Sequence, residues 1–168
     1  MNPIFKKLNY KDQAVIYVVN APESFHPAMD EMRAVAEVHN SLAKAKGAQF
    51  AIAFATKQAE VDKFAVQAAK STEGDAVIWV AYPKGSSKKY RCEFNRDTGW
   101  AEMGAQGFEP VRQVAIDEDW SALRFRRAEH IKTMTRSFAM TKTGQEKVKQ
   151  AKHAKQAKQA KQPRQKSP

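Results

Sequence analysis

The chain has a single cysteine and no long apolar run in its 168 residues, and each shortage excludes a class of protein. Because Cys92 has no second cysteine to pair with, no internal disulfide can form, which excludes a disulfide-stapled domain. A membrane-spanning helix needs about 18 or more consecutive apolar residues, and no such stretch is present. The first residues also lack the apolar core of a signal peptide. We therefore expect a cytoplasmic protein with no membrane partner.

Several catalytic and cofactor motifs are missing as well. The four histidines are scattered, without a second ligand at metal-binding spacing, so no metal is expected. The sequence has no P-loop, which would hold phosphates, and no G-x-S-x-G motif, which would hold a nucleophilic serine. An enzyme is therefore not favoured by the residues present.

Positive charge is abundant but unevenly distributed. The net charge is +11. Residues 142–168 hold nine Lys or Arg against one acid, a net charge of +8, which leaves only +3 for residues 1–141. The basic character therefore belongs mainly to the end of the chain and says little about the fold.

Apolar periodicity predicts the main elements. Runs rich in β-branched residues predict strands at 14–19, 48–55, 76–82, 111–116 and 121–126. Apolar residues at helical spacing predict a helix over 28–46 that Gly47 ends, and a second helix from residue 56 or 57 with Val61, Phe64, Ala65 and Ala68 on one face. Residues 94–105 predict a short, weak helix interrupted by Gly99.

The order of these elements indicates the architecture. Strands that alternate with helices favour a mostly parallel α/β sheet with helices on both faces. Residues 117–120 are too few for a parallel crossover, so the last two strands must form an antiparallel hairpin. We expect a small Rossmann-like domain with five strands over residues 1–128, a C-terminal helix over 129–143, and a basic low-complexity tail over 144–168, disordered or a frayed helix.

Four blocks of sequence carry a resemblance: LNYKDQAVIYVVNAPESF, AVIWVAYPKGSSK, NRDTGW and VAIDEDWSALRFRR. Over residues 8–127 they resemble a family of small bacterial proteins known only as a domain of unknown function. That family is in turn similar to a shortened class I methyltransferase. The resemblance implies a sheet that lacks the usual second and third strands, with its five strands in the order 1-2-3-5-4.

The resemblance does not extend to a cofactor site. A nucleotide-type site needs glycines after the first strand, where the backbone approaches the ligand. The loop from Asn20 to Phe25 has none and contains Pro22. The acid that would hold ribose hydroxyls has no counterpart if the second strand is absent. We therefore expect no cofactor, and no S-adenosylmethionine binding in the usual mode.

The strand ends offer one candidate small-ligand site. Residues 83–88, PKGSSK, follow a buried strand at its carboxyl end, where α/β proteins bind ligands. The predicted site residues, for a ligand of unknown identity, are Asn20, Glu23, Thr56, Lys84, Ser86, Ser87 and Lys88. A flexible, solvated turn is the favoured alternative, because loops lie at the surface.

The hairpin raises the question of what neutralises two arginines. Along the last strand Leu123 and Phe125 share one face, and Arg124 and Arg126 the other. In an internal strand they need a carboxylate or a bound anion, because an unpaired buried charge costs several kcal/mol. Ion pairs are favoured over an anion site, with acids of the covering helices or of the turn as partners: Asp117, Glu118 and Asp119. On an edge strand both arginines would be solvated.

Two further residue types have competing interpretations. Arg91 could lower the pKa of Cys92, but a lone cysteine is more often a small buried hydrophobic residue. The tryptophans Trp79, Trp100 and Trp120 are expected in the core or a lid rather than stacked on a base.

The tail resembles basic arms that contact phosphates without reading sequence. Its cations are Lys147, Lys149, Lys152, Lys155, Lys158, Lys161, Arg164 and Lys166. Lysines that step by three wind around a helix axis, so they form no single stripe and no apolar face. A role as a solubilising segment is equally consistent with the composition. The functions left open are polyanion binding by a non-enzymatic module, a small-ligand or vestigial methyltransferase site, and a protein-interaction module.

Overall fold

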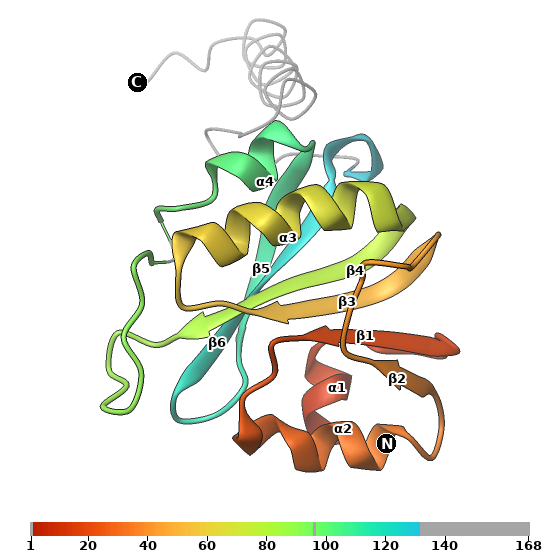
Figure 1. Ribbon diagram of the computed structural model, residues 1–168, viewed down its shortest axis with the longest axis horizontal. Coiled ribbons are helices and arrows are strands. Elements are labelled where there is room, and N and C mark those ends of the chain that lie inside the picture. Colours follow the sequence, from red (N-terminus) through yellow and green to blue (C-terminus); the bar gives the residue numbers. More distant parts are fainter. Residues whose placement is uncertain (1, 96, 132–168) are drawn as a thin grey trace, which may run out of the picture.

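The computed structural model describes residues 2–95 and 97–131, which form one six-stranded sheet with helices on both faces (Figure 1). The strands are β1 Val15–Val19, β2 Glu37–His39, β3 Ala48–Phe54, β4 Thr72–Pro83, β5 Phe108–Ala115 and β6 Trp120–Arg127. The helices are α1 Pro3–Lys7, α2 His26–Met32, α3 Gln58–Ser71 and α4 Ala101–Ala105, with 3-10 turns η1 Glu23–Phe25 and η2 Ala128–His130. The sheet order is β2-β1-β3-β4-β6-β5.

The strand directions confirm the predicted fold class. The strands β2, β1, β3 and β4 are parallel to one another, and β6 runs antiparallel to both β4 and β5. All five predicted strands are present, and they follow one another across the sheet in the predicted order. The short connection between the last two strands forms the expected hairpin.

The structure corrects the helix that was expected over residues 28–46. That helix ends at Met32, and residues 37–39 form β2 alongside β1 instead. Met32 is buried on one face of the sheet and Leu42 on the other, so one straight helix cannot place both. Val35, counted as part of the helical apolar face, is 60% exposed. Gly47, with a φ of +65°, turns the chain into β3 instead of ending a helix.

The added strand also corrects what the resemblance implied. The usual second strand of a methyltransferase was expected to be missing, but β2 occupies the place beside β1 in a three-residue form. The weak helix over 94–105 is likewise shorter than expected. Only residues 101–105 are helical, because Gly99 adopts a φ of +90° immediately before them.

Two apolar layers enclose the sheet. The helix α3 places Val61, Phe64, Ala65 and Ala68 on the sheet as predicted, and α4 lies beside it on the same face (Figure 1). The opposite face packs against α1 and α2. Its centre is Trp79, fully buried, whose Nε1 donates a hydrogen bond of 2.8 Å to the carbonyl of Leu8. Trp100 and Trp120 are also buried, as the core assignment predicted.

Other expectations fall partly or wholly outside the described residues. Those over the C-terminal helix 129–143 and the tail 144–168 lie almost entirely beyond residue 131. Within the described part of the chain, no helix is both long and apolar enough to cross a bilayer. The same residues contain no group of three or more His, Cys, Asp and Glu side chains placed to hold a metal ion.

Candidate functional site

The carboxyl ends of β1 and β3 form the point where the strand order reverses, which is the usual ligand site of an open α/β sheet. The chain reaches β2 on one side of β1 and then returns to β3 on the other. Asn20 follows β1 with a φ of +57°. Asparagine tolerates this left-handed conformation better than most residues, so Asn20 supplies the turn that a glycine makes in nucleotide-binding folds.

The side chain of Glu60 occupies this reversal point. Its Oε1 accepts hydrogen bonds of 3.1 Å from the backbone amides of Thr56 and Lys57, and its Oε2 accepts one of 3.5 Å from Nδ2 of Asn20. The Glu93 carboxylate accepts from the amide of Gln58, at 2.8 Å. Amides at a helix start normally attract an anion, and here two carboxylates of the chain itself take that place.

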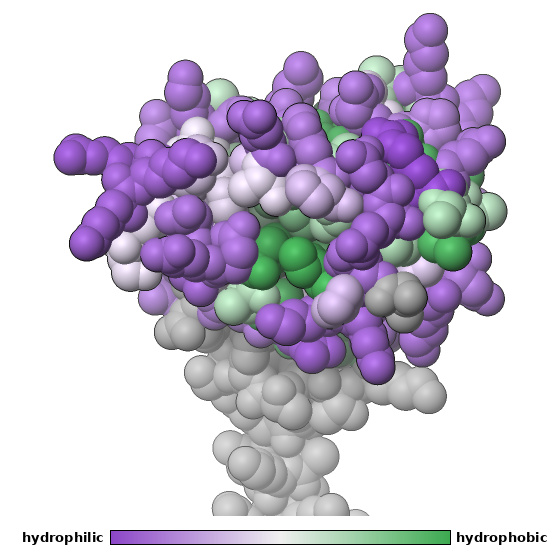
Figure 2. Space-filling view, turned by 90° about the horizontal axis from the view of Figure 1, so that it is seen from below, coloured by the Kyte–Doolittle hydropathy of each residue, from purple (hydrophilic) through white to green (hydrophobic). Residues whose placement is uncertain are grey.

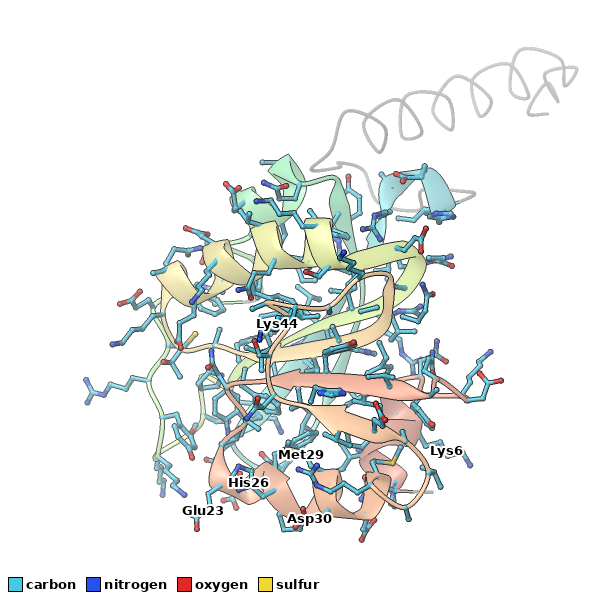
Figure 3. All side chains as sticks on the ribbon, turned by 45° about the vertical axis from the view of Figure 1, so that its right-hand side comes forward. Lys6, Glu23, His26, Met29, Asp30 and Lys44 are labelled. Carbon is cyan, nitrogen blue, oxygen red and sulfur yellow. The ribbon has the colours of Figure 1, made fainter. Side chains whose placement is uncertain are left out.

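The predicted site residues from this part of the chain do not all meet. Asn20 and Thr56 lie together around Glu60. Glu23 is exposed on η1 and, like His26 and Asp30, points away from the sheet (Figure 3).

A cleft of about 820 Å³ lies instead at the carboxyl end of β4. It runs between the segment that follows β4 and the β5–β6 hairpin, and is lined by Tyr82, Pro83, Lys84, Gly85, Ser86, Ser87, Tyr90, Arg91, Cys92, Glu93, Phe94, Asn95, Gln113 and Ser121. Of the predicted site residues, Lys84, Ser86 and Ser87 line this cleft, whereas Lys88, Asn20, Glu23 and Thr56 do not.

Aromatic rings form a firm floor for the cleft. Tyr82 and Phe94 are buried, with ring centroids 6.0 Å apart, and Trp100 packs against both at 5.7 and 5.1 Å. Nε2 of Gln113 donates to the hydroxyl of Tyr82 at 2.8 Å. This bond holds the tyrosine ring in place between β4 and β5 and presents an apolar surface with a polar rim.

The acids of the hairpin turn hold the loop after β4. Ser87 Oγ donates to Asp119 Oδ1 at 2.8 Å and accepts from the amides of Lys89 and Tyr90. The amide of Lys84 donates to the carbonyl of Asp119, also at 2.8 Å. Asp117 in turn accepts from the amide of Asp119. Ser87 is thus engaged in holding the loop, and the hairpin acids act as positioning residues.

Sequence reasoning missed several lining residues, among them Arg91, Asn95, Gln113 and Ser121. Gln113 and Ser121 come from the two strands of the hairpin, whose register pairs Gln113 with Leu123 and Ser121 with Ala115. Gln113 is a polar residue on the same sheet face as the core residue Leu123, and this mismatch could have identified it. Arg91 and Asn95 lie in an irregular segment, where periodicity carries no information.

The structure also decides the interpretation of Cys92. Burial is the main cause that raises the pKa of its thiol, and the charges of Glu93 and Glu60 raise it further, against a backbone hydrogen bond from Phe94 that lowers it. The suggested lowering by Arg91 is therefore wrong. Cys92 packs against the core under α3, as a small hydrophobic residue does.

Arg126 is neutralised by an acid that was not among the named partners. Asp75, in β4, accepts from Nε and Nη2 of Arg126 at 2.9 and 2.7 Å, in a two-bonded fork. These bonds lower the pKa of Asp75, partly offset by its burial. The predicted partners Asp117 and Asp119 instead hold the hairpin turn and the loop. Ion pairing is therefore confirmed for Arg126, but with a different acid.

Arg124 is in a different situation. Its Nε is buried and has no hydrogen-bond partner among the described residues. Burial is the main cause that lowers the pKa of its guanidinium, followed by the charge of Arg126, and the charge of Arg112 adds to the effect. The favoured interpretation of two structural ion pairs thus fails for Arg124.

Comparisons with known proteins bear on the fold. No protein-family model and no curated protein matches the sequence. Among solved structures, an S-adenosylmethionine-dependent methyltransferase from Aquifex aeolicus matches 74% of this chain and 87% of its own, with a TM-score of 0.51 at 10% identity. A possible exported protein from Bordetella parapertussis matches 74% of this chain and 65% of its own, with a TM-score of 0.50 at 9% identity.

The chain has a methyltransferase-like Rossmann fold. At 10% identity the likeness extends to the fold alone. The predicted similarity to a class I methyltransferase is thereby confirmed as a statement about architecture. The resemblance to the domain family of unknown function finds no support in these comparisons.

Proposed function

We propose that this protein is a non-enzymatic, methyltransferase-like module that holds a small anionic ligand with a planar ring in the cleft after β4. The observation that carries this proposal is that the usual ligand position is filled by a side chain, whereas a cleft is open elsewhere. Glu60 occupies the strand-end position where related folds place a ligand, and an 820 Å³ cleft opens at the end of β4, the strand next to β3. Ligand pockets for small molecules range from roughly 300 to 1,000 Å³, so the cleft has room for a nucleotide-sized molecule.

The lining supports both parts of such a ligand. Lys84 and Arg91 supply two cations against the single carboxylate of Glu93, and the Glu93 carboxylate already accepts from Gln58. The buried rings of Tyr82 and Phe94 give the cleft an apolar floor on which a planar ring can rest. Polar groups at the rim and an aromatic floor are the usual composition of a ligand pocket.

Calorimetric titration with ADP, adenosine and S-adenosylmethionine tests this function. ADP should bind, and Lys84→Ala and Arg91→Ala should each weaken binding by about tenfold, because a hydrogen bond to a charged group contributes about 1.5 kcal/mol or more. Lys63→Ala, which removes an exposed lysine on α3, is the matched control and should leave the affinity unchanged. Adenosine should bind more weakly than ADP.

Two results would count against the proposal. Absence of heat and of backbone amide shifts around the cleft with all three ligands would remove it. Tight binding of S-adenosylmethionine that is insensitive to Lys84→Ala would instead favour a vestigial methyltransferase site at the strand ends.

The charge distribution favours a second candidate function, binding of nucleic acid or another polyanion by the basic arm, residues 142–168. Nine cations against one acid in 27 residues are suited to contacts with phosphates that do not depend on base sequence. On this proposal the folded domain anchors the arm, and the partner is recognised by charge alone.

A charge-matched pair of full-length variants tests the arm. The first carries Lys→Gln at residues 149, 152, 155, 158 and 161, and the second carries it at five exposed domain lysines, Lys6, Lys44, Lys46, Lys63 and Lys70. For the unchanged protein, the slope of log affinity against log salt should be roughly −4 to −7 if five to eight phosphates are contacted. The arm variant should lose most of this slope, and the domain variant little. Equal losses in fluorescence anisotropy titrations would contradict the arm's role.

A further inference from the structure

Three arginines, which we call the arginine row, lie together on one face of the β5–β6 hairpin: Arg112, Arg124 and Arg126. Arg112 and Arg124 are directly opposite each other on neighbouring antiparallel strands, and Arg126 lies two residues further along β6 on the same face. Like charges directly opposite on two strands destabilise a sheet. The arrangement therefore needs negative charge from some source.

The described residues supply only part of that charge. Asp75 holds Arg126 with two bonds. Glu109 lies opposite Arg126 in the register. With both acids counted, three guanidinium groups face two carboxylates, and Lys7 adds a further cation near β5 through a 3.3 Å bond to the carbonyl of Ala115. The row thus keeps an excess of positive charge.

Arg124 is the member with the clearest deficit. Its Nε is buried and finds no acceptor in residues 2–95 and 97–131, which costs free energy that a hydrogen bond would recover. Asp75, the acid that raises the pKa of Arg124, has its carboxylate oxygens bound by Arg126. Arg112 itself is exposed on β5, an edge strand of the sheet. A ligand can therefore approach the pair from solvent.

The row also lies close to the last described residue, Ile131. Nη2 of Arg126 donates to the carbonyl of His130 at 3.1 Å, and the described chain ends one residue later. The face seen from below in Figure 2 is mostly hydrophilic around a small apolar area.

We propose that the arginine row contacts the phosphodiester backbone of a nucleic acid, with Arg112 and Arg124 touching phosphates and Arg126 as a positioning residue held by Asp75. Guanidinium groups bind phosphate oxygens through planar, two-bonded contacts. A phosphate between Arg112 and Arg124 would supply the missing charge. The inference rests on and deepens the polyanion function proposed for the arm, because one nucleic-acid strand would contact both the arm and the arginine row.

Anisotropy titrations of full-length protein against a fluorescein-labelled 20-nucleotide single strand test the inference. Arg112→Gln and Arg124→Gln should each weaken binding by about fivefold near 100 mM salt and reduce the magnitude of the salt slope by about 0.7, the value for one phosphate contact on single strands. Arg33→Gln removes the same charge from an exposed site paired with Asp30 and should change the affinity less than twofold.

A second measurement keeps the test independent of folding. In ¹H–¹⁵N spectra of the arginine side chains, the Nε–H signals of Arg112 and Arg124 should shift on addition of the strand, and that of Arg33 should not. If Arg124→Gln fails to fold, Arg112→Gln on the exposed edge carries the titration.

The outcomes separate the row from the arm. If the arm-lysine variant loses its salt slope and the row variants behave like Arg33→Gln, the proposed role of the row is overturned and that of the arm stands. Loss in the row variants with an unaffected arm variant would support the row and contradict the arm. Unshifted Nε–H signals at saturating nucleic acid would also overturn the proposal.

Discussion

Trp79→Ala is expected to lower the free energy of unfolding by about 3–5 kcal/mol, the range for truncating a buried Trp or Phe. Trp79 is fully buried in β4 and pairs with Ile52 on one side and Arg124 on the other. Its indole also holds the segment after α1, through the 2.8 Å bond to Leu8 that spans 71 residues of sequence. The substitution should therefore both open a cavity in the core and release α1 from the sheet.

Urea denaturation followed by circular dichroism measures this loss. Trp79→Phe keeps much of the ring volume but leaves the carbonyl of Leu8 without its donor, so it should cost less, about 1–3 kcal/mol. Val111→Ala, at a position that is 39% exposed, serves as the surface control and should stay within about 0.5 kcal/mol of the unchanged protein. A loss below 1 kcal/mol for Trp79→Ala would contradict the position assigned to the indole.

Gly99→Ala is expected to have the second largest effect, a loss of roughly 2–4 kcal/mol. The backbone at Gly99 has a φ of +90°, and an L-residue in a left-handed conformation costs about 1–2 kcal/mol. The added Cβ would also come within 2.6 Å of Cβ of Phe94 and 2.7 Å of Oε1 of Gln58. Gln58 is held in place because its Nε2 donates to both Gly99 and Asp62 at 2.8 Å.

This substitution tests stability and the cleft together. Phe94 is part of the cleft floor, so Gly99→Ala should also weaken ligand binding, by displacing that ring. Gly85→Ala is the matched control, because Gly85 lines the same cleft and an added Cβ there would meet no atom within 4 Å. It should be neutral or stabilise by up to about 1 kcal/mol. Equal stability of the two variants, measured in urea, would refute the predicted conformation at Gly99.

The sheet architecture follows largely from local patterns in the sequence. Short apolar runs identified five strands, and helical spacing identified the buried face of α3 correctly. The few residues between β5 and β6 required a hairpin, because chain length alone forbids a parallel crossover there. These features depend on neighbouring residues, so a single sequence contains them.

The features that define the site depend on residues far apart in the chain. The short β2 was missed because it forms by pairing with β1, and its own three residues carry little signal. Asp75 pairs with Arg126 across 51 residues, whereas the nearby acids Asp117 and Asp119 hold the turn and the loop. Similarly, Glu60 meets Asn20 across 40 residues of sequence, and no local pattern predicts that contact.

The sequence by itself therefore determined the fold class, the hairpin and the concentration of positive charge in residues 142–168, since periodicity, loop length and charge are local properties. Tertiary structure alone decided where a cleft opens and which arginine has a buried Nε without a hydrogen-bond partner among the described residues. Both depend on strand register and on which side chains meet across the sheet. Arg124 and Arg126 lie two positions apart on one face of β6. Strand register is what brings Asp75 to Arg126 and not to Arg124.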